Sequence, residues 1–172
     1  MKAILIWTLV PFLGAEVVDS AANGFTVKTV LTVKAPPAEV YAKLIHNVGD
    51  WWNSGHTFSH DSHNLSIEEK AMGCFCEKLP NNGMVRHMEV VFLAPGKTLV
   101  MSGALGPLQS LAATGSMTIQ LSAADGGTKM EVVYRVTGYL PAGMNTWAAP
   151  VDSVVAEQFK RLKNFAETGD PK

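Results

Sequence analysis

The stretch from Phe25 to Trp52 constrains the fold of this chain more than any other part of its sequence. The β-branched run FTVKTVLTV predicts a first strand, because its apolar residues recur among threonine and lysine. Pro37 suits the first turn of a helix, where a missing N–H breaks no hydrogen bond. The segment after it carries apolar residues on one helical face and leads to Trp51-Trp52. A strand followed directly by a short amphipathic helix is therefore expected.

Short strands and tight turns are predicted for the region that follows. Pro80-Asn81-Asn82-Gly83 and Asp125-Gly126-Gly127 are turn-forming sequences. The polar, histidine-rich segment 56–64 is expected to be a loop. The expected strands are Leu65–Glu69, Cys74–Leu79, Val85–Leu93, Leu99–Gly103, Gly115–Ala123 and Lys129–Thr137.

The C-terminal segment is predicted to be a long helix. Apolar residues recur at three- and four-residue spacing from Val151 to Phe165, and Gly169 is suited to end the helix. Together these elements predict an α+β fold, in which a curved antiparallel sheet of about seven strands wraps around the long C-terminal helix.

Length and composition exclude some classes of partner. The 172 residues suit one domain, and 47% hydrophobic against 17% charged residues allows a large core or a lined cavity. A formal net charge of −1 argues against nucleic acid or an anionic membrane surface as an electrostatic partner.

The N-terminus has the pattern of a secretory signal. Lys2 precedes an uncharged apolar run, and Ser20-Ala21-Ala22 offers small residues for cleavage before Asn23. The run is shorter than the roughly 20 residues that span a bilayer. We expect a signal peptide over residues 1–22 and an exported protein, periplasmic or secreted, with no stable membrane insertion after cleavage. A cut before Glu16, an uncleaved anchor or a buried N-terminal strand are the alternatives.

The order of elements resembles that of the START-like (SRPBCC) superfamily, from about Gly24 to Phe165. The segments that carry the resemblance are APPAEVYAKLI, the Trp-Trp pair, NLSIEE, GCFCEKLPNNG, FLAPGKTLVMSG and VVAEQFKRL. The chain is most similar to the polyketide-cyclase and Hsp90-ATPase-activator-like branches, and to secreted bacterial members of unassigned activity. The resemblance implies a helix-grip domain over residues 24–168, with a cavity between the sheet and the last helix.

This cavity is expected to hold a small hydrophobic or amphipathic molecule, without a cofactor or a metal. Loops 56–63 and 104–113 would close one end of it. The expected ligand-binding residues are Trp52, His56, Cys76, Arg86, Met88, Leu108, Tyr139, Trp147, Val155 and Phe159.

Cys74 and Cys76 allow more than one interpretation. In an extended strand both side chains lie on one face with Cα atoms about 6.5 Å apart, at the edge of disulfide reach. The sequence favours two small buried thiols, and a reducible disulfide or a pair of metal ligands are the alternatives.

Histidines gather in the loop after the tryptophan pair. His56, His60, Asp61 and His63 are residue types that bind zinc, but their spacing matches no specific metal motif. An exposed polar loop at the cavity mouth is therefore favoured. Within it His56 is the preferred hydrogen-bond donor or general acid/base.

Strand alternation assigns the residues of segment 85–92 to two faces. It places Arg86, Met88, Val90 and Phe92 on the more apolar face, and His87 on the other. Arg86 is then expected to form a surface ion pair with Glu77, or to bind an acidic ligand group at the rim.

These observations favour a carrier or binding protein. The alternatives are a cyclase- or isomerase-type enzyme, in which His56 or Glu77 moves protons, and a protein-interaction module. No serine nucleophile motif or phosphate-binding loop is present in the sequence.

Overall fold

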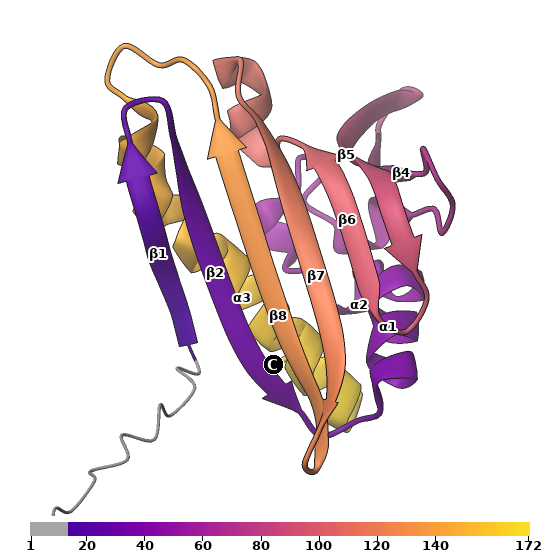
Figure 1. Cartoon of the computed structure of the whole chain (residues 1–172). Coiled ribbons are helices and arrows are strands. Elements are labelled where there is room, and N and C mark those ends of the chain that lie inside the picture. The colour runs from indigo at the N-terminus through magenta and orange to yellow at the C-terminus, as the bar shows by residue number, and fades with distance from the viewer. Residues whose placement is uncertain (1–13) are drawn as a thin grey trace, which may run out of the picture.

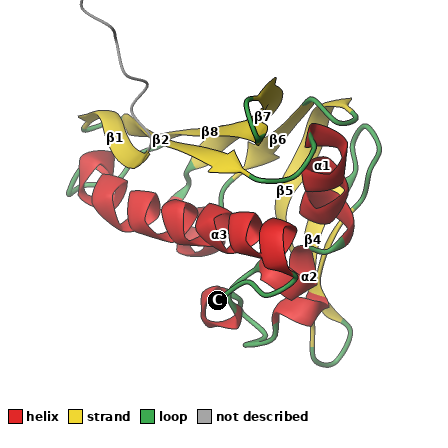
Figure 2. Ribbon diagram, turned by 90° about the horizontal axis from the view of Figure 1, so that it is seen from below, coloured by secondary structure: helices red, strands yellow, loops and turns green. Residues whose placement is uncertain are grey.

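The structure, a computed structural model, describes residues 14–172. The N-terminal part of the expected signal peptide, residues 1–13, lies outside the described residues. The described chain is an α+β domain in which one antiparallel sheet is covered on one face by helices (Figures 1 and 2). The strands are β1 (Gly14–Ala21), β2 (Gly24–Val33), β3 (Leu65–Ile67), β4 (Cys74–Leu79), β5 (Gly83–Ala94), β6 (Thr98–Gly103), β7 (Thr114–Ala124) and β8 (Gly127–Thr137).

The eight strands lie in the order β1-β2-β8-β7-β6-β5-β4-β3. Strands that follow one another in the chain pair with each other, except β2 and β3. Strand β2 pairs with β8 instead. The chain thus leaves the sheet after β2, forms the helices and β3, and returns strand by strand to β2. The sequence prediction of about seven strands included every strand except β1, which pairs with β2 at the edge.

Helix α1 (Pro37–His46) begins where the sequence predicts. Pro36 is extended, Pro37 occupies the first turn, and the buried residues Val40, Tyr41, Leu44 and Ile45 form one face. The short helix α2 (Val48–Trp51) follows at once and buries Trp51 in the core. Figure 2 shows α1 and α2 at the end of the molecule formed by β4 and β5.

Helix α3 (Ala148–Thr168) runs across the concave face of the sheet (Figure 2). Val155, Phe159, Leu162 and Ala166 are buried at spacings of three or four residues, which is the period of a helix face. Gly169 ends the helix with φ of 80°, a conformation that glycine adopts without steric cost. This arrangement of sheet and helix is a helix-grip fold.

Four 3-10 turns complete the described structure. They are η1 (Ser54–His56), η2 (Ser62–Asn64), η3 (Gly106–Leu111) and η4 (Met144–Trp147). In residues 14–172, no helix has both the length and the apolar character needed to cross a membrane.

Candidate functional site

A pocket of about 320 Å³ opens between α3, the sheet and two loops. Its walls are mostly apolar and aromatic, and the titratable side chains that line it are His56 and His87. The lining residues are Trp52, Gly55, His56, Thr57, Phe58, Leu65, Phe75, His87, Leu105, Gly106, Pro107, Leu108, Trp147, Pro150, Val151, Val154 and Val155.

Hydrogen bonds fix the loop that forms one side of the mouth. The N–H of Asn53 donates to Oε1 of Gln158 (2.8 Å), and its side-chain amide donates to Glu157 of α3. Trp52 Nε1 donates to the carbonyl oxygen of His56 (3.1 Å). The loop is thus attached to the helix on one side and to the aromatic wall on the other.

His56 lies at this mouth with its ring about one-third exposed. Its Nε2 is 3.2 Å from Oε2 of Glu157. Hydrogen bonds from Asn53 and then from His56 hold the pKa of Glu157 below its usual value, although partial burial opposes this. The geometry gives His56 a fixed carboxylate partner in contact with solvent.

Tyr134 positions the opposite loop from inside the core. Its ring is fully buried; its hydroxyl accepts a hydrogen bond from the N–H of Leu105 (3.2 Å) and donates to the carbonyl oxygen of Gly103 (3.3 Å). Burial raises the pKa of Tyr134 to about 12, so it remains a neutral donor at physiological pH. Leu105 and the residues after it then line the pocket.

Glu77 and His87 form a buried pair on the sheet side of the pocket. Glu77 on β4 is fully buried and His87 on β5 is 6% exposed, with 2.9 Å between Oε2 and Nε2. The other carboxylate oxygen of Glu77 accepts a hydrogen bond from the N–H of Ser59. The carboxylate is therefore satisfied on both oxygens by the mouth loop and the histidine.

The two protonation states follow from these contacts. Burial raises the pKa of Glu77, but hydrogen bonds from Ser59, Phe58 and His87 outweigh it and the net shift is downward. Burial lowers the pKa of His87 more than the neighbouring Glu77 raises it. At neutral pH the pair is thus an ionised carboxylate beside a neutral imidazole, which donates its Nε2–H to the carboxylate.

A β-bulge explains why strand alternation assigned His87 to the wrong face. Cys76 pairs with Arg86 and Phe75 with Met88, so His87 is an extra residue on β5. His87 and Met88 are consequently both buried, and Arg86 points outward. The alternating pattern contains no sign of this bulge, and His87 was not among the expected site residues.

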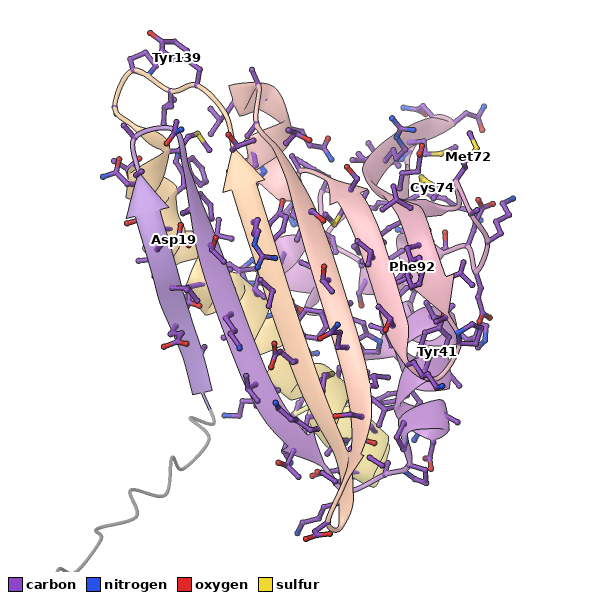
Figure 3. The ribbon with its side chains drawn as sticks, in the orientation of Figure 1. Asp19, Tyr41, Met72, Cys74, Phe92 and Tyr139 are labelled. Carbon is purple, nitrogen blue, oxygen red and sulfur yellow. A yellow bond between two sulfur atoms is a disulfide. The ribbon has the colours of Figure 1, made fainter. Side chains whose placement is uncertain are left out.

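The structure contradicts the prediction made for Arg86. It does not pair with Glu77 and does not line the pocket; its guanidinium contacts Glu89 at 2.8 Å on the exposed surface. A second extra residue, Val91, reverses the alternation again, so that Phe92 is 54% exposed instead of facing the core (Figure 3).

The other expected ligand-binding residues divide into two groups. Trp52, His56, Leu108, Trp147 and Val155 line the pocket, and their contact with a ligand stays a prediction. Cys76, Met88 and Phe159 are buried but are not among the residues that line it. Tyr139 is 78% exposed on the loop after β8 and does not line the pocket (Figure 3).

Cys74 and Cys76 form a disulfide, which corrects the favoured interpretation of two free thiols. Their Cα atoms are 5.3 Å apart, closer than in a fully extended strand and inside the usual range for a disulfide. Figure 3 shows the bridge beside Cys74, next to the turn that carries Met72.

Two of the loop histidines contact different carboxylates. His63 contacts Asp61 at 2.9 Å, whereas His56 contacts Glu157 at 3.2 Å on α3. Within the described part of the chain no group of three or more histidine, cysteine or acidic side chains has a geometry that could hold a metal ion.

Comparisons with known proteins support the fold and give no family. No known family matches the sequence, and no characterised protein matches it. Solved structures do match. An uncharacterised protein from Rhizobium leguminosarum aligns with a TM-score of 0.61 at 16% identity, over 89% of this chain and 96% of its own.

Two further structural neighbours have more informative descriptions. The Aha1 dimer from Colwellia psychrerythraea has a TM-score of 0.59 at 18% identity, covering 84% of this chain and 97% of its own. DynU16, from the dynemicin biosynthetic locus, has a TM-score of 0.58 at 18% identity, covering 85% of this chain and 48% of its own. At such identities the likeness concerns the fold alone.

Proposed function

We propose that this protein is an exported binding protein that holds a small hydrophobic or amphipathic molecule in the pocket beneath α3. The observation that carries the proposal is the pocket itself. Its volume of about 320 Å³ lies near the lower end of the range of roughly 300–1,000 Å³ typical of ligand sites. Its walls offer Trp52, Phe75 and Val155 on different elements.

Apolar burial would supply most of the binding free energy. Burial contributes about 25 cal/mol per Å² of apolar surface, before the costs of association are subtracted. The hydrogen bonds of Asn53 and Tyr134 hold the two mouth loops in place. Because the walls of the pocket are already ordered, binding does not incur the entropic cost of ordering them.

Native mass spectrometry of the protein purified from its own host tests the proposal. We expect the wild type to retain a small molecule, and Val154→Trp, which fills the pocket, to be empty. Ser153→Trp is the matched control, because Ser153 is the preceding residue of α3 and lies exposed outside the pocket. An empty wild type that also fails to take up N-phenyl-1-naphthylamine would contradict the proposal.

A proton-transfer enzyme of the cyclase or isomerase type is the second candidate. The buried Glu77–His87 pair on the pocket wall favours it, since a neutral imidazole oriented by a carboxylate is a suitable general base. The description of DynU16 as a biosynthetic-locus protein is consistent with that class. Turnover of the retained molecule, lost in His87→Gln, would distinguish this enzyme from a carrier.

Export and the leader remain part of the proposal. Cleavage before Asn23 would remove β1, which pairs with β2 at the edge of the sheet and whose residues are exposed except Gly14, which is intermediate. The rest of the domain, from β2 to α3, would keep the pocket.

A further inference from the structure

We propose that His87 is the polar anchor of this pocket and accepts, through Nδ1, a hydrogen bond from a hydroxyl group of the ligand. Glu77 acts as the positioning residue that fixes the imidazole in the tautomer required. The ligand class is then a neutral phenol or alcohol with a flat apolar body, and not a carboxylate. This inference rests on the proposed function, because it names the ligand of the same pocket.

The two oxygens of Glu77 determine the tautomer. One accepts from the N–H of Ser59, and the other is 2.9 Å from Nε2 of His87. An ionised carboxylate can only accept hydrogen bonds, so Nε2 must carry the proton. In a neutral imidazole this leaves Nδ1 as an acceptor.

Nδ1 is the atom left open to a ligand. No residue in the range 14–172 forms a hydrogen bond with it, although the His87 ring lines the pocket. Nδ1 of His87 is not fully enclosed either. The fully enclosed side-chain polar atoms without a partner are Thr29 Oγ1, Tyr41 Oη, Asp152 Oδ1 and Gln158 Nε2. A ligand hydroxyl would supply the missing donor in a site that is otherwise apolar.

The charge around the pocket disfavours an anionic ligand. Among the described residues that line it there is no lysine or arginine. Both histidines that line the pocket contact a carboxylate: His87 contacts Glu77, and His56 contacts Glu157. A ligand carboxylate would lose its hydration and meet the lone pair of Nδ1, without a cation to compensate.

Aromatic side chains around His87 favour a flat ring. Phe58 stacks on the imidazole with an angle of 9° between planes and 6.0 Å between centroids. The ring centroid of Phe75 lies 5.3 Å from that of the same imidazole, and Phe75 forms a T-shaped contact with Trp52 at 5.5 Å. Further ring contacts with such walls add stabilisation beyond simple burial.

Isothermal titration with matched naphthalene derivatives tests the anchor. For the wild type we expect 2-naphthol to bind about tenfold more tightly than naphthalene, as one net hydrogen bond gives, and 2-naphthoate to bind more weakly than either. His87→Phe should bind both neutral compounds equally. Thermal unfolding checks that each variant is folded.

Glu77→Gln provides a result that a merely structural role would not produce. The N–H of Ser59 still requires an oxygen, so the new amide nitrogen must donate to Nε2 of His87. The imidazole proton then moves to Nδ1, which becomes a donor. We expect this variant to prefer 2-acetonaphthone, an acceptor, over 2-naphthol, reversing the preference of the wild type.

The outcomes separate this inference from the proposed function. Equal binding of naphthalene and 2-naphthol by the wild type would overturn the anchor and leave the apolar pocket standing. Binding of none of the compounds would overturn both. As a readout without mutation, ¹⁵N chemical shifts of the His87 ring should show Nε2 protonated and Nδ1 unprotonated; the reverse assignment would also overturn the anchor.

Discussion

The backbone N–H of Asn53 donates a hydrogen bond of 2.8 Å to Oε1 of Gln158, a side chain with no exposed surface. The two residues are 105 positions apart in the chain, and this bond joins the mouth loop to the middle of α3. The buried amide of Gln158 therefore helps to hold one wall of the pocket in position.

Replacing Gln158 with methionine removes the acceptor and keeps the volume. We expect a loss of about 1–3 kcal/mol in the free energy of unfolding, because the N–H of Asn53 is left without its partner. Hydrogen exchange at Asn53 and Gly55 should accelerate. Glu157→Gln is the control: it keeps an oxygen for Asn53 and should change exchange at Asn53 much less. Unchanged exchange in Gln158→Met would show that the bond does not hold the loop.

Tyr134→Phe tests the opposite wall. The variant keeps the buried ring and removes the hydroxyl that joins Leu105 to Gly103. We expect a loss of about 1–2 kcal/mol in stability and weaker binding of any ligand, since the loop before Leu108 is freed. Chemical denaturation and ligand titration measure the two effects. Full stability with full affinity would contradict this role of the hydroxyl.

The Glu77–His87 pair predicts that stability falls in acid in two stages. The pKa of His87 lies below its ordinary value of 6.5, so the unfolded chain binds a proton first and stability declines as pH falls below that value. The pKa of Glu77 lies below 4.5, and its contribution is lost as pH falls further through that lowered pKa. Urea denaturation in steps of pH measures both stages.

Glu77 is the titratable side chain that faces His87 in the described structure, which makes the variants easy to interpret. His87→Phe should abolish the first stage, because no group is left to take up that proton. A stability curve for the wild type that stays flat between pH 7 and pH 5 would contradict the assignment of a neutral buried imidazole.

The Cys74–Cys76 disulfide is expected to resist alkylation. Mass spectrometry of denatured, unreduced protein should show no modified thiol, and two after reduction. Because the bridge closes a loop of only a few residues, its chain-entropy contribution is about 1–2 kcal/mol, so the reduced domain should still fold. Two alkylated cysteines without reduction would show that the thiols are free.

The predicted cleavage before Asn23 should leave a stable domain. Side chains of β1 are mostly exposed. Burial, and then the negative charge of Glu16 on β1, raises the pKa of Asp152 on α3. Removal of β1 thus breaks the hydrogen bonds between β1 and β2 but exposes few buried apolar side chains of β1. We expect residues 23–172 to unfold within a few degrees of residues 14–172, by calorimetry. N-terminal sequencing of the exported protein identifies the cut, and a start at Glu16 would contradict the predicted site.

The local elements were predictable because their signals are local. Pro37 and the apolar face from Val40 to Ile45 define α1, and the spacing from Val155 to Ala166 defines the buried face of α3. The turn at Asp125 to Gly127 lies where composition predicts it, between β7 and β8. The α+β class and the helix across a curved sheet follow from these signals in chain order.

The residues of β5 show where such signals fail. Alternation placed Arg86 on the face of Met88 and Val90 and His87 on the opposite face, and the extra residue at His87 made this assignment wrong. The second extra residue, Val91, did the same for Phe92. A bulge is decided by how two strands pair, and the sequence of one strand does not record it. The mouth contacts of Asn53 have the same origin, since their partners on α3 are more than 100 residues away.

The order of elements, the apolar faces of the helices and the aromatic character of the pocket can be read from consecutive residues. Which polar groups reach that pocket depends on folding, because the register between β4 and β5 places Glu77 beside His87. Helix and strand periods are properties of consecutive residues, whereas a buried hydrogen-bonded pair is a property of segments that meet only after folding.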